Sequence, residues 1–108
     1  MAIIGDLEPI YRGEDVVLTI DMPEDITGWD IRMYLVDPVT GTEIWASGAA
    51  SITNALTGVC QIAVSAAVSM AWAARLHWYE VRRVNVGSVA VLRTGNIPVW
   101  DSPHTRTG

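Results

Sequence analysis

The sequence predicts an all-β fold, a two-sheet β-sandwich of about seven short strands with one short helix in a late connection. Three observations favour this fold. Apolar and polar residues alternate along several short segments, turn-forming residues separate those segments, and only one stretch is rich in alanine. The 108 residues are enough for one domain. We therefore expect a single domain over residues 1–108, with flexible arms at residues 1–7 and 101–108.

The first half of the chain contains two predicted strands and a hairpin. Residues 16–22 and residues 29–36 both alternate between apolar and polar side chains, the period of a half-buried strand. Trp29 begins the apolar face of the second strand and is expected in the core. Residues 42–46 follow the turn-forming sequence of residues 37–41 and return as a short hairpin partner.

Two predicted turns depend on individual residues. Gly13 and Gly28 each precede a strand, where a turn often requires a positive φ. Asp25 and Thr27 can hold the second turn by hydrogen bonds from side chain to backbone. These four residues are interpreted as structural.

The middle of the chain predicts two further strands and the helix. Residues 51–54 and residues 59–64 are the strands, and Cys60 shares the apolar face of the second. Ser65 stands where a helix N-cap would, before an alanine-rich stretch that ends at Ala74. This pattern predicts a helix of about two turns.

Residues 76–84 and residues 89–100 form the last two predicted strands, and Pro98 places the final one at a sheet edge or near its own end. Both faces of residues 76–84 carry large side chains. Leu76, Trp78 and Val84 lie on one face, and His77, Tyr79 and Val81 on the other. Alternation does not decide which face is buried. The face turned away from the opposite sheet needs a cover, either the predicted helix or another protein subunit.

The composition indicates a protein with partners. Half of the residues are hydrophobic, only 18% are charged, and five are Trp. So many indole rings exceed what a small core accommodates, and surplus aromatic residues are typical of protein interfaces. The candidate interface residues are Leu76, Trp45, Trp72, Trp78 and Trp100. An exposed ring could instead stack on a sugar, although few amide side chains accompany the rings.

Charge and targeting signals exclude several classes. The net charge of −5 disfavours nucleic acid or an anionic membrane as the main partner. The N-terminal residues lack the basic start of a signal peptide, and the longest apolar stretch is too short to span a bilayer. A single cysteine, Cys60, excludes an internal disulfide.

No catalytic site, cofactor or metal is predicted. Serine-nucleophile and phosphate-loop motifs are absent from the sequence. Cys60 and His77 are the one conceivable nucleophile pair, because His104 lies in the predicted C-terminal arm, and we interpret them as a core thiol and a strand histidine. Asp21, Glu24 and Asp25 could hold a calcium ion, but a solvated turn explains them more simply.

Several segments together resemble a module of bacteriophage virion proteins. The segments are Tyr11-Arg12-Gly13-Glu14-Asp15 before the first strand, Asp25-Ile26-Thr27-Gly28-Trp29 before the second, His77-Trp78-Tyr79-Glu80-Val81 after the helix, and Val91-Leu92-Arg93-Thr94-Gly95-Asn96-Ile97-Pro98-Val99 at the end. Over roughly residues 7–100 the chain is similar to the N-terminal domain of phage baseplate upper proteins. His77 departs from that pattern, which has an aromatic residue there, and residues 46–56 have no counterpart.

The resemblance implies an immunoglobulin-like antiparallel sandwich that attaches one part of a virion to another without catalysis. We therefore expect a self-associating structural protein that is made in the host cytoplasm and docks onto a larger virion component of the tail, baseplate or fibre attachment. Capsid decoration or a head fibre is the alternative placement. A glycan-binding sandwich is the alternative of another class.

Overall fold

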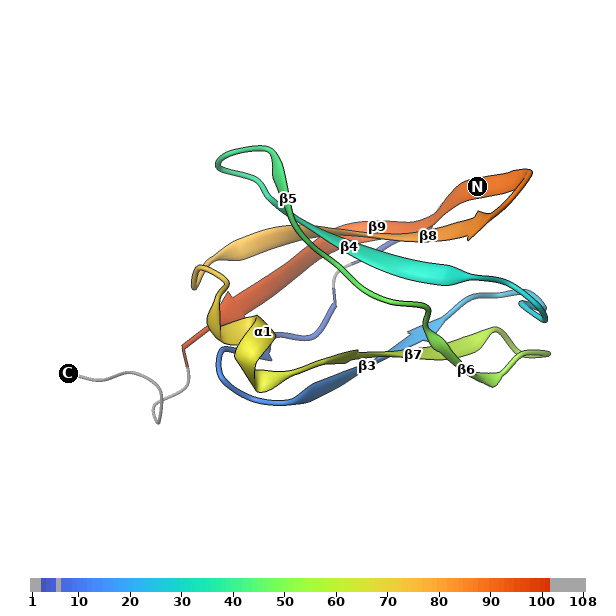
Figure 1. The fold of residues 1–108 in the computed structure, drawn as a ribbon, viewed down its shortest axis with the longest axis horizontal. Helices are drawn as coiled ribbons and strands as arrows, with labels where there is room; N and C mark the ends of the chain where they lie inside the picture. The colour runs from blue at the N-terminus through green and yellow to red at the C-terminus, as the bar shows by residue number, and fades with distance from the viewer. Residues whose placement is uncertain (1–2, 6, 102–108) are drawn as a thin grey trace.

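The structure, a computed structural model, describes residues 3–5 and 7–101, and within them two sheets face each other as a β-sandwich (Figure 1). The larger sheet contains β1 (Ile3–Ile4), β2 (Ile10–Tyr11), β4 (Ile31–Asp37), β5 (Thr42–Ala46), β8 (Leu76–Asn85) and β9 (Ser88–Trp100). The smaller sheet contains β3 (Val16–Asp21), β6 (Ser51–Asn54) and β7 (Val59–Val64). The helix α1 (Ala66–Met70) lies at one end of the sandwich. The predicted all-β sandwich with one short helix is confirmed.

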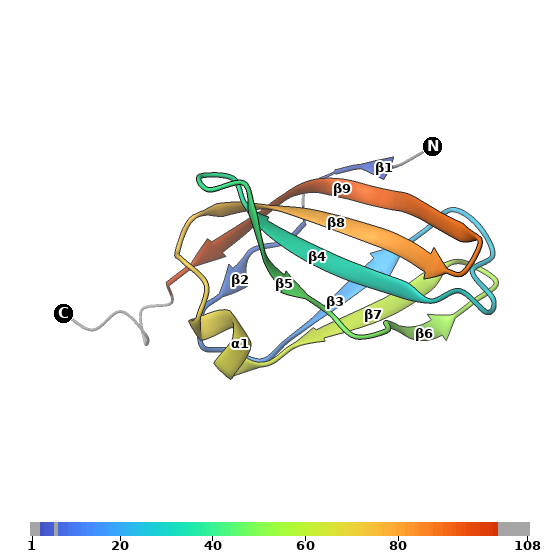
Figure 2. The same cartoon turned by 45° about the horizontal axis from the view of Figure 1, so that its top comes forward.

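The strand order of the larger sheet is β1-β9-β8-β4-β5, and β2 also pairs with β9 (Figure 2). The order of the smaller sheet is β3-β7-β6. All pairs are antiparallel except that β1 and β2 both run parallel to β9. The seven predicted strands are present, and the short β1 and β2 are additions that the sequence did not predict.

The prediction of a flexible N-terminal arm at residues 1–7 is wrong for residues 3–5 and 7, which the structure describes. The backbone N–H of Gly5 donates to Thr94 O at 3.0 Å, and that of Leu7 donates to Asn96 O at 2.9 Å. Residues 3–5 and 7 are therefore attached to β9. Asp101, at the start of the expected C-terminal arm, forms an ion pair with Arg12 at 2.7 Å. Residues 1, 2, 6 and 102–108, and His104 with them, lie outside the described residues.

Pro98 lies near the end of β9, as predicted. It also explains why β1 and β2 pair with β9 as two separate short strands. Carbonyl oxygens of Asn96 and Trp100 accept hydrogen bonds on the side of β1 and β2. The next backbone nitrogen on that side belongs to Pro98, which has no N–H to donate. The parallel ladder is therefore interrupted between β1 and β2.

The core lies between the sheets and takes one face from each strand. In β3, the side chains of Leu18 and Ile20 are buried and those between them are exposed. In β8, the buried face is that of His77, Tyr79 and Val81. This answers the question that alternation left open.

The helix is shorter than expected. Ser65 caps it as predicted, because its Oγ accepts from the N–H of Val68 at 3.3 Å, but the helix ends at Met70. The chain then turns so that Trp72 enters the core with 4% of its surface exposed. Burial of this indole overrides the helix propensity of the alanines around it. Within the described residues, no helix is long and apolar enough to cross a membrane.

The two predicted turns are confirmed. Gly13 and Gly28 have φ values of 81° and 77°, where a side chain would be strained. Asp25 Oδ1 accepts from the N–H of Thr27 at 2.9 Å and from its hydroxyl at 2.6 Å, and these bonds lower the pKa of Asp25.

Trp29 departs from its predicted place. It is only half-buried at the rim of the core, where the guanidinium carbon of Arg83 lies 4.3 Å from its ring centre. The cation lies over the indole, and this contact stabilises a ring that is only partly buried.

Candidate docking surface

The five candidate interface residues separate into two groups. Leu76, Trp78 and Trp100 lie on the outer face of the larger sheet, and each side chain is about half exposed, at 48%, 50% and 48%. Trp72 is buried and Trp45 is partly buried against the core, both next to α1, with ring centres 5.3 Å apart in an edge-to-face pair. The prediction that all five share an interface is wrong for Trp72, which is core, and Trp45 is mostly covered.

Strand register places three more apolar residues beside the exposed group. Val36 on β4 is opposite Trp78, Pro98 on β9 is opposite Leu76, and Tyr11 on β2 is opposite Trp100. Together they form what we call the aromatic stripe, which crosses the outer face of the larger sheet: Tyr11, Val36, Leu76, Trp78, Pro98 and Trp100.

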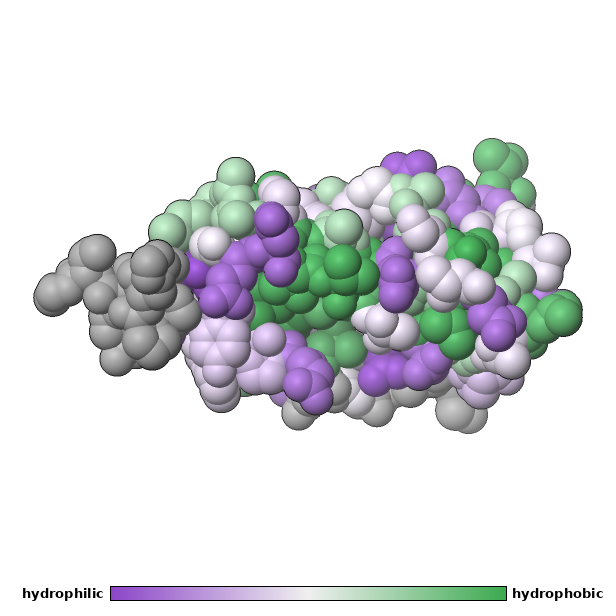
Figure 3. Space-filling view, turned by 90° about the horizontal axis from the view of Figure 1, so that it is seen from below, coloured by the Kyte–Doolittle hydropathy of each residue, from purple (hydrophilic) through white to green (hydrophobic). Residues whose placement is uncertain are grey.

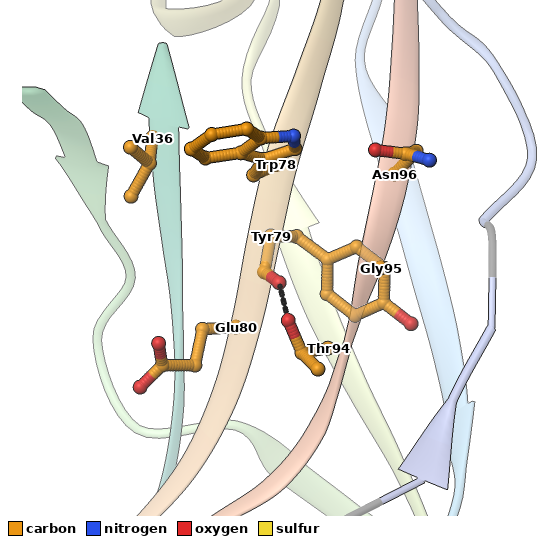
Figure 4. A pocket seen from close by; sticks show the side chains of 7 residues that line it. All are labelled: Val36, Trp78, Tyr79, Glu80, Thr94, Gly95 and Asn96. Atoms are coloured by element: carbon orange, nitrogen blue, oxygen red, sulfur yellow. Dashed lines mark hydrogen bonds between the residues drawn. The ribbon is translucent and has the colours of Figure 1, made fainter. Parts of the chain in front are cut away.

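Side-chain packing orders the aromatic stripe at both of its ends. The rings of Tyr11 and Trp100 meet edge to face, with centres 6.0 Å apart. At the other end, the Trp78 indole extends over β8 toward Val36 (Figure 4). A shallow hollow of about 360 Å³ lies beside this ring, and Glu80, Thr94 and Asn96 form its polar side.

The same sheet face becomes polar beyond the stripe. Glu80 is ion-paired with Arg82 on β8, and Arg32 on β4 lies opposite Arg82 and pairs with Asp30 at 3.0 Å. These pairs are partly exposed and add little stability. Their effect is to bound the apolar area on one side.

Tyr79 supports the face from below. Its hydroxyl donates to Gly5 O at 2.5 Å and accepts from Arg93 Nε at 2.8 Å. Its backbone carbonyl accepts from the Thr94 hydroxyl at 3.0 Å, the dashed line in Figure 4. Gly95 leaves room for this arrangement, since a Cβ there would lie 2.1 Å from Gly5 O. The platform under Trp78 is therefore held by β8, β9 and Gly5, the residue that follows β1.

Tyr11, Val36 and Pro98 were not predicted as surface residues. Val36 ends the otherwise polar face of its strand, a weak signal that becomes meaningful only with the β4–β8 register. Tyr11 lies in a strand of two residues, too short for periodicity. Their apolar neighbours come from distant parts of the chain, so pairing information was needed to find them.

Cys60 and His77 do not form a reactive pair in the described structure. Cys60 is completely buried on β7 in the smaller sheet, and His77 is completely buried on β8 in the larger sheet. The His77 Nε2 lies 2.9 Å from Ala73 O, and Nδ1 has no hydrogen-bond partner. Asp21, Glu24 and Asp25 are exposed, and no group of acidic, His or Cys side chains among the described residues is placed to hold a metal ion.

We predict that the native Cys60 thiol resists alkylation. Burial, followed by the charge of Asp21, raises its pKa from 9.0 to about 11, so the folded protein carries about a hundredfold less thiolate at pH 8 than the unfolded chain. Iodoacetamide labelling followed by mass spectrometry, with and without denaturant, checks this. Equal rates in the two states would contradict the burial of Cys60.

The same shift has a pH consequence for stability. Above pH 9 the unfolded chain loses the thiol proton while the folded chain keeps it, so the free energy of unfolding is expected to fall as pH rises from 9 toward 11. A Cys60→Ser variant removes this contribution, because its hydroxyl does not titrate in that range.

The chain matches no model of a known protein family, and no curated protein sequence is significantly similar to it.

Proposed function

We propose that this protein is a non-enzymatic structural component of a bacteriophage particle, with an immunoglobulin-like sandwich that self-associates and docks onto a larger virion protein through the aromatic stripe. The observation that carries the docking function is the joint exposure of Leu76, Trp78 and Trp100 on one sheet face. The phage context is supported by the sequence resemblance described above. A tail, baseplate or fibre attachment is the proposed position, and capsid decoration or a head fibre is the alternative.

Physical chemistry supports an interface at this face. Half-exposed Trp and Leu side chains retain apolar surface whose removal from water is favourable, at about 25 cal/mol per Å². Tryptophan and tyrosine are also the residues that most often dominate binding energy at the centre of interfaces. The supported sheet beneath them reduces the ordering cost of binding.

Light scattering across a concentration series tests self-association. We expect the wild-type protein to form a closed oligomer, and Trp78→Ala or Leu76→Ala to raise its dissociation constant by at least about tenfold. Leu56→Ala is the control, because this side chain is 76% exposed but belongs to a loop outside the stripe. A monomer at every concentration, or an equal effect of the control, would contradict self-association through this face.

One observation favours a glycan-binding module as a second candidate. Asn96 lies directly opposite the exposed Trp78, and Glu80 and Thr94 line the same hollow. An aromatic platform beside amide, carboxylate and hydroxyl groups can stack on a sugar ring and hydrogen-bond its hydroxyls. Asn96→Ala would then abolish glycan binding and leave association intact, whereas Leu76→Ala would have the reverse effect.

A further inference from the structure

The strand β3 is an edge of the smaller sheet and pairs with β7 alone. Just past its end, the N–H of Met22 donates to Gly58 O at 2.7 Å. Backbone groups alternate in direction along an antiparallel strand, so the even-numbered residues of β3 face β7 and the odd-numbered ones face away. In the part of the chain that the structure describes, the outward N–H and C=O groups of Val17, Thr19 and Asp21 have no backbone partner.

The side chains along this edge leave it accessible. Val17 is 59% exposed, and Thr19 and Asp21 are also exposed. An unprotected edge of six residues is a template for a further strand. Neither proline nor a bulge interrupts the β3–β7 register, so the edge is regular over its whole length.

The sequence from residue 13 to residue 31, which includes β3, carries only negative charges. Five carboxylates lie between residues 14 and 25, and no arginine or lysine occurs from residue 13 to residue 31. The other seven acidic residues equal the seven arginines in number, so these five account for the net charge of −5. None of the five takes part in a described ion pair. They are Glu14, Asp15, Asp21, Glu24 and Asp25.

An apolar hollow lies beside the first residues of β3, on the side of β7 and α1. It measures about 450 Å³, and Val17, Ala63 and Val68 are among the side chains that line it. The face of the smaller sheet shows apolar residues gathered near its middle with hydrophilic residues around them (Figure 3). On this face, the side chains of an added strand would lie beside the exposed Val17.

We infer that β3 accepts an extended basic segment of a partner protein, which adds to the smaller sheet as a further strand. Backbone hydrogen bonds from Val17, Thr19 and Asp21 would give affinity, and the surrounding carboxylates would select arginine or lysine at the segment's ends. A second copy of this chain is the poorer occupant, because pairing β3 with itself brings two sets of these carboxylates together. This inference does not depend on the aromatic stripe, which lies on the outer face of the other sheet.

A synthetic peptide, acetyl-Arg-Val-Thr-Val-Thr-Val-Arg-amide, serves as the probe with the full-length protein. Calorimetry should detect its binding, and the backbone amide NMR signals of Val17, Thr19 and Asp21 should shift. The same peptide with glutamate at both ends should bind at least about tenfold more weakly at low salt. A version with N-methyl groups on alternate residues, which lacks the donors on one edge, should bind about as weakly.

Variants of the protein locate the contact. Thr19→Pro removes an outward N–H but no bond to β7, so it should abolish peptide binding while the β3–β7 pairing remains. If this variant fails to fold, Asp21→Asn with Glu24→Gln provides the test and should weaken binding by about three- to tenfold. Glu43→Gln on β5 is the matched control and should leave binding unchanged.

Each contrary result has a clear meaning. Absent binding, equal binding of the basic and acidic peptides, or shifts confined to Leu76 and Trp78 would overturn the inference. Self-association that Thr19→Pro abolishes would show that a second copy occupies the edge instead, which also overturns it. Failure of the proposed docking function is distinguishable, because it depends on Trp78→Ala and not on any change in β3.

Discussion

Replacing Gly58 with alanine is expected to unfold the domain or to lower its free energy of unfolding by more than about 3 kcal/mol. Gly58 has a φ of 84°, where an L-residue with a side chain is strained. A Cβ at this position would also lie 2.0 Å from Met22 O and 2.5 Å from Glu24 O. The obstructing atoms are backbone, and Met22 is fixed by its own hydrogen bond to Gly58 O, so the structure cannot relax by a side-chain movement.

Urea denaturation of matched glycine variants measures this effect. Gly41→Ala shares the positive φ, at 69°, but meets no atom within 4 Å, and should cost only about 1 kcal/mol. Gly48→Ala has neither feature and should be close to neutral. If Gly58→Ala cost no more than Gly41→Ala, the close approach of the β6–β7 turn to the end of β3 would be wrong.

Much of the fold was predictable because apolar and polar residues alternate along its longer strands. Residues 16–22 placed Leu18 and Ile20 inward, and the structure buries both. The strands β1 and β2 have two residues each, and no period can be recognised in so short a segment. Their parallel pairing with β9 is a contact between the two ends of the chain, which local sequence does not encode.

The candidate surface was predictable in part. Leu76, Trp78 and Trp100 were selected as aromatic or apolar residues in late strands, and the structure exposes all three on one face. Trp72 was selected from the predicted helix as one of the surplus indole rings, yet it is core. Composition counts the indole rings but does not say which of them are buried. The burial of Trp72 depends on the direction in which the chain leaves α1. That direction is set by tertiary packing, which no local pattern reports.

Replacing Trp72 with alanine is accordingly expected to lower the free energy of unfolding by about 3–5 kcal/mol. The indole is 4% exposed and packs edge to face against Trp45. Its removal leaves a cavity at the end of the sandwich that α1 closes, and the surrounding backbone limits how far neighbouring side chains can fill it.

Comparing Trp72→Ala with Trp78→Ala separates the effect of a tryptophan on stability from its effect on association. Trp78 is half exposed, so its loss should lower the free energy of unfolding by only about 1 kcal/mol while it weakens association. Urea denaturation and light scattering on both variants, at a concentration where the wild type is a single species, measure the two quantities. An equal stability loss in the two variants would contradict the outward direction of Trp78. A stable, fully folded Trp72→Ala would contradict its place in the core and return it to the candidate interface.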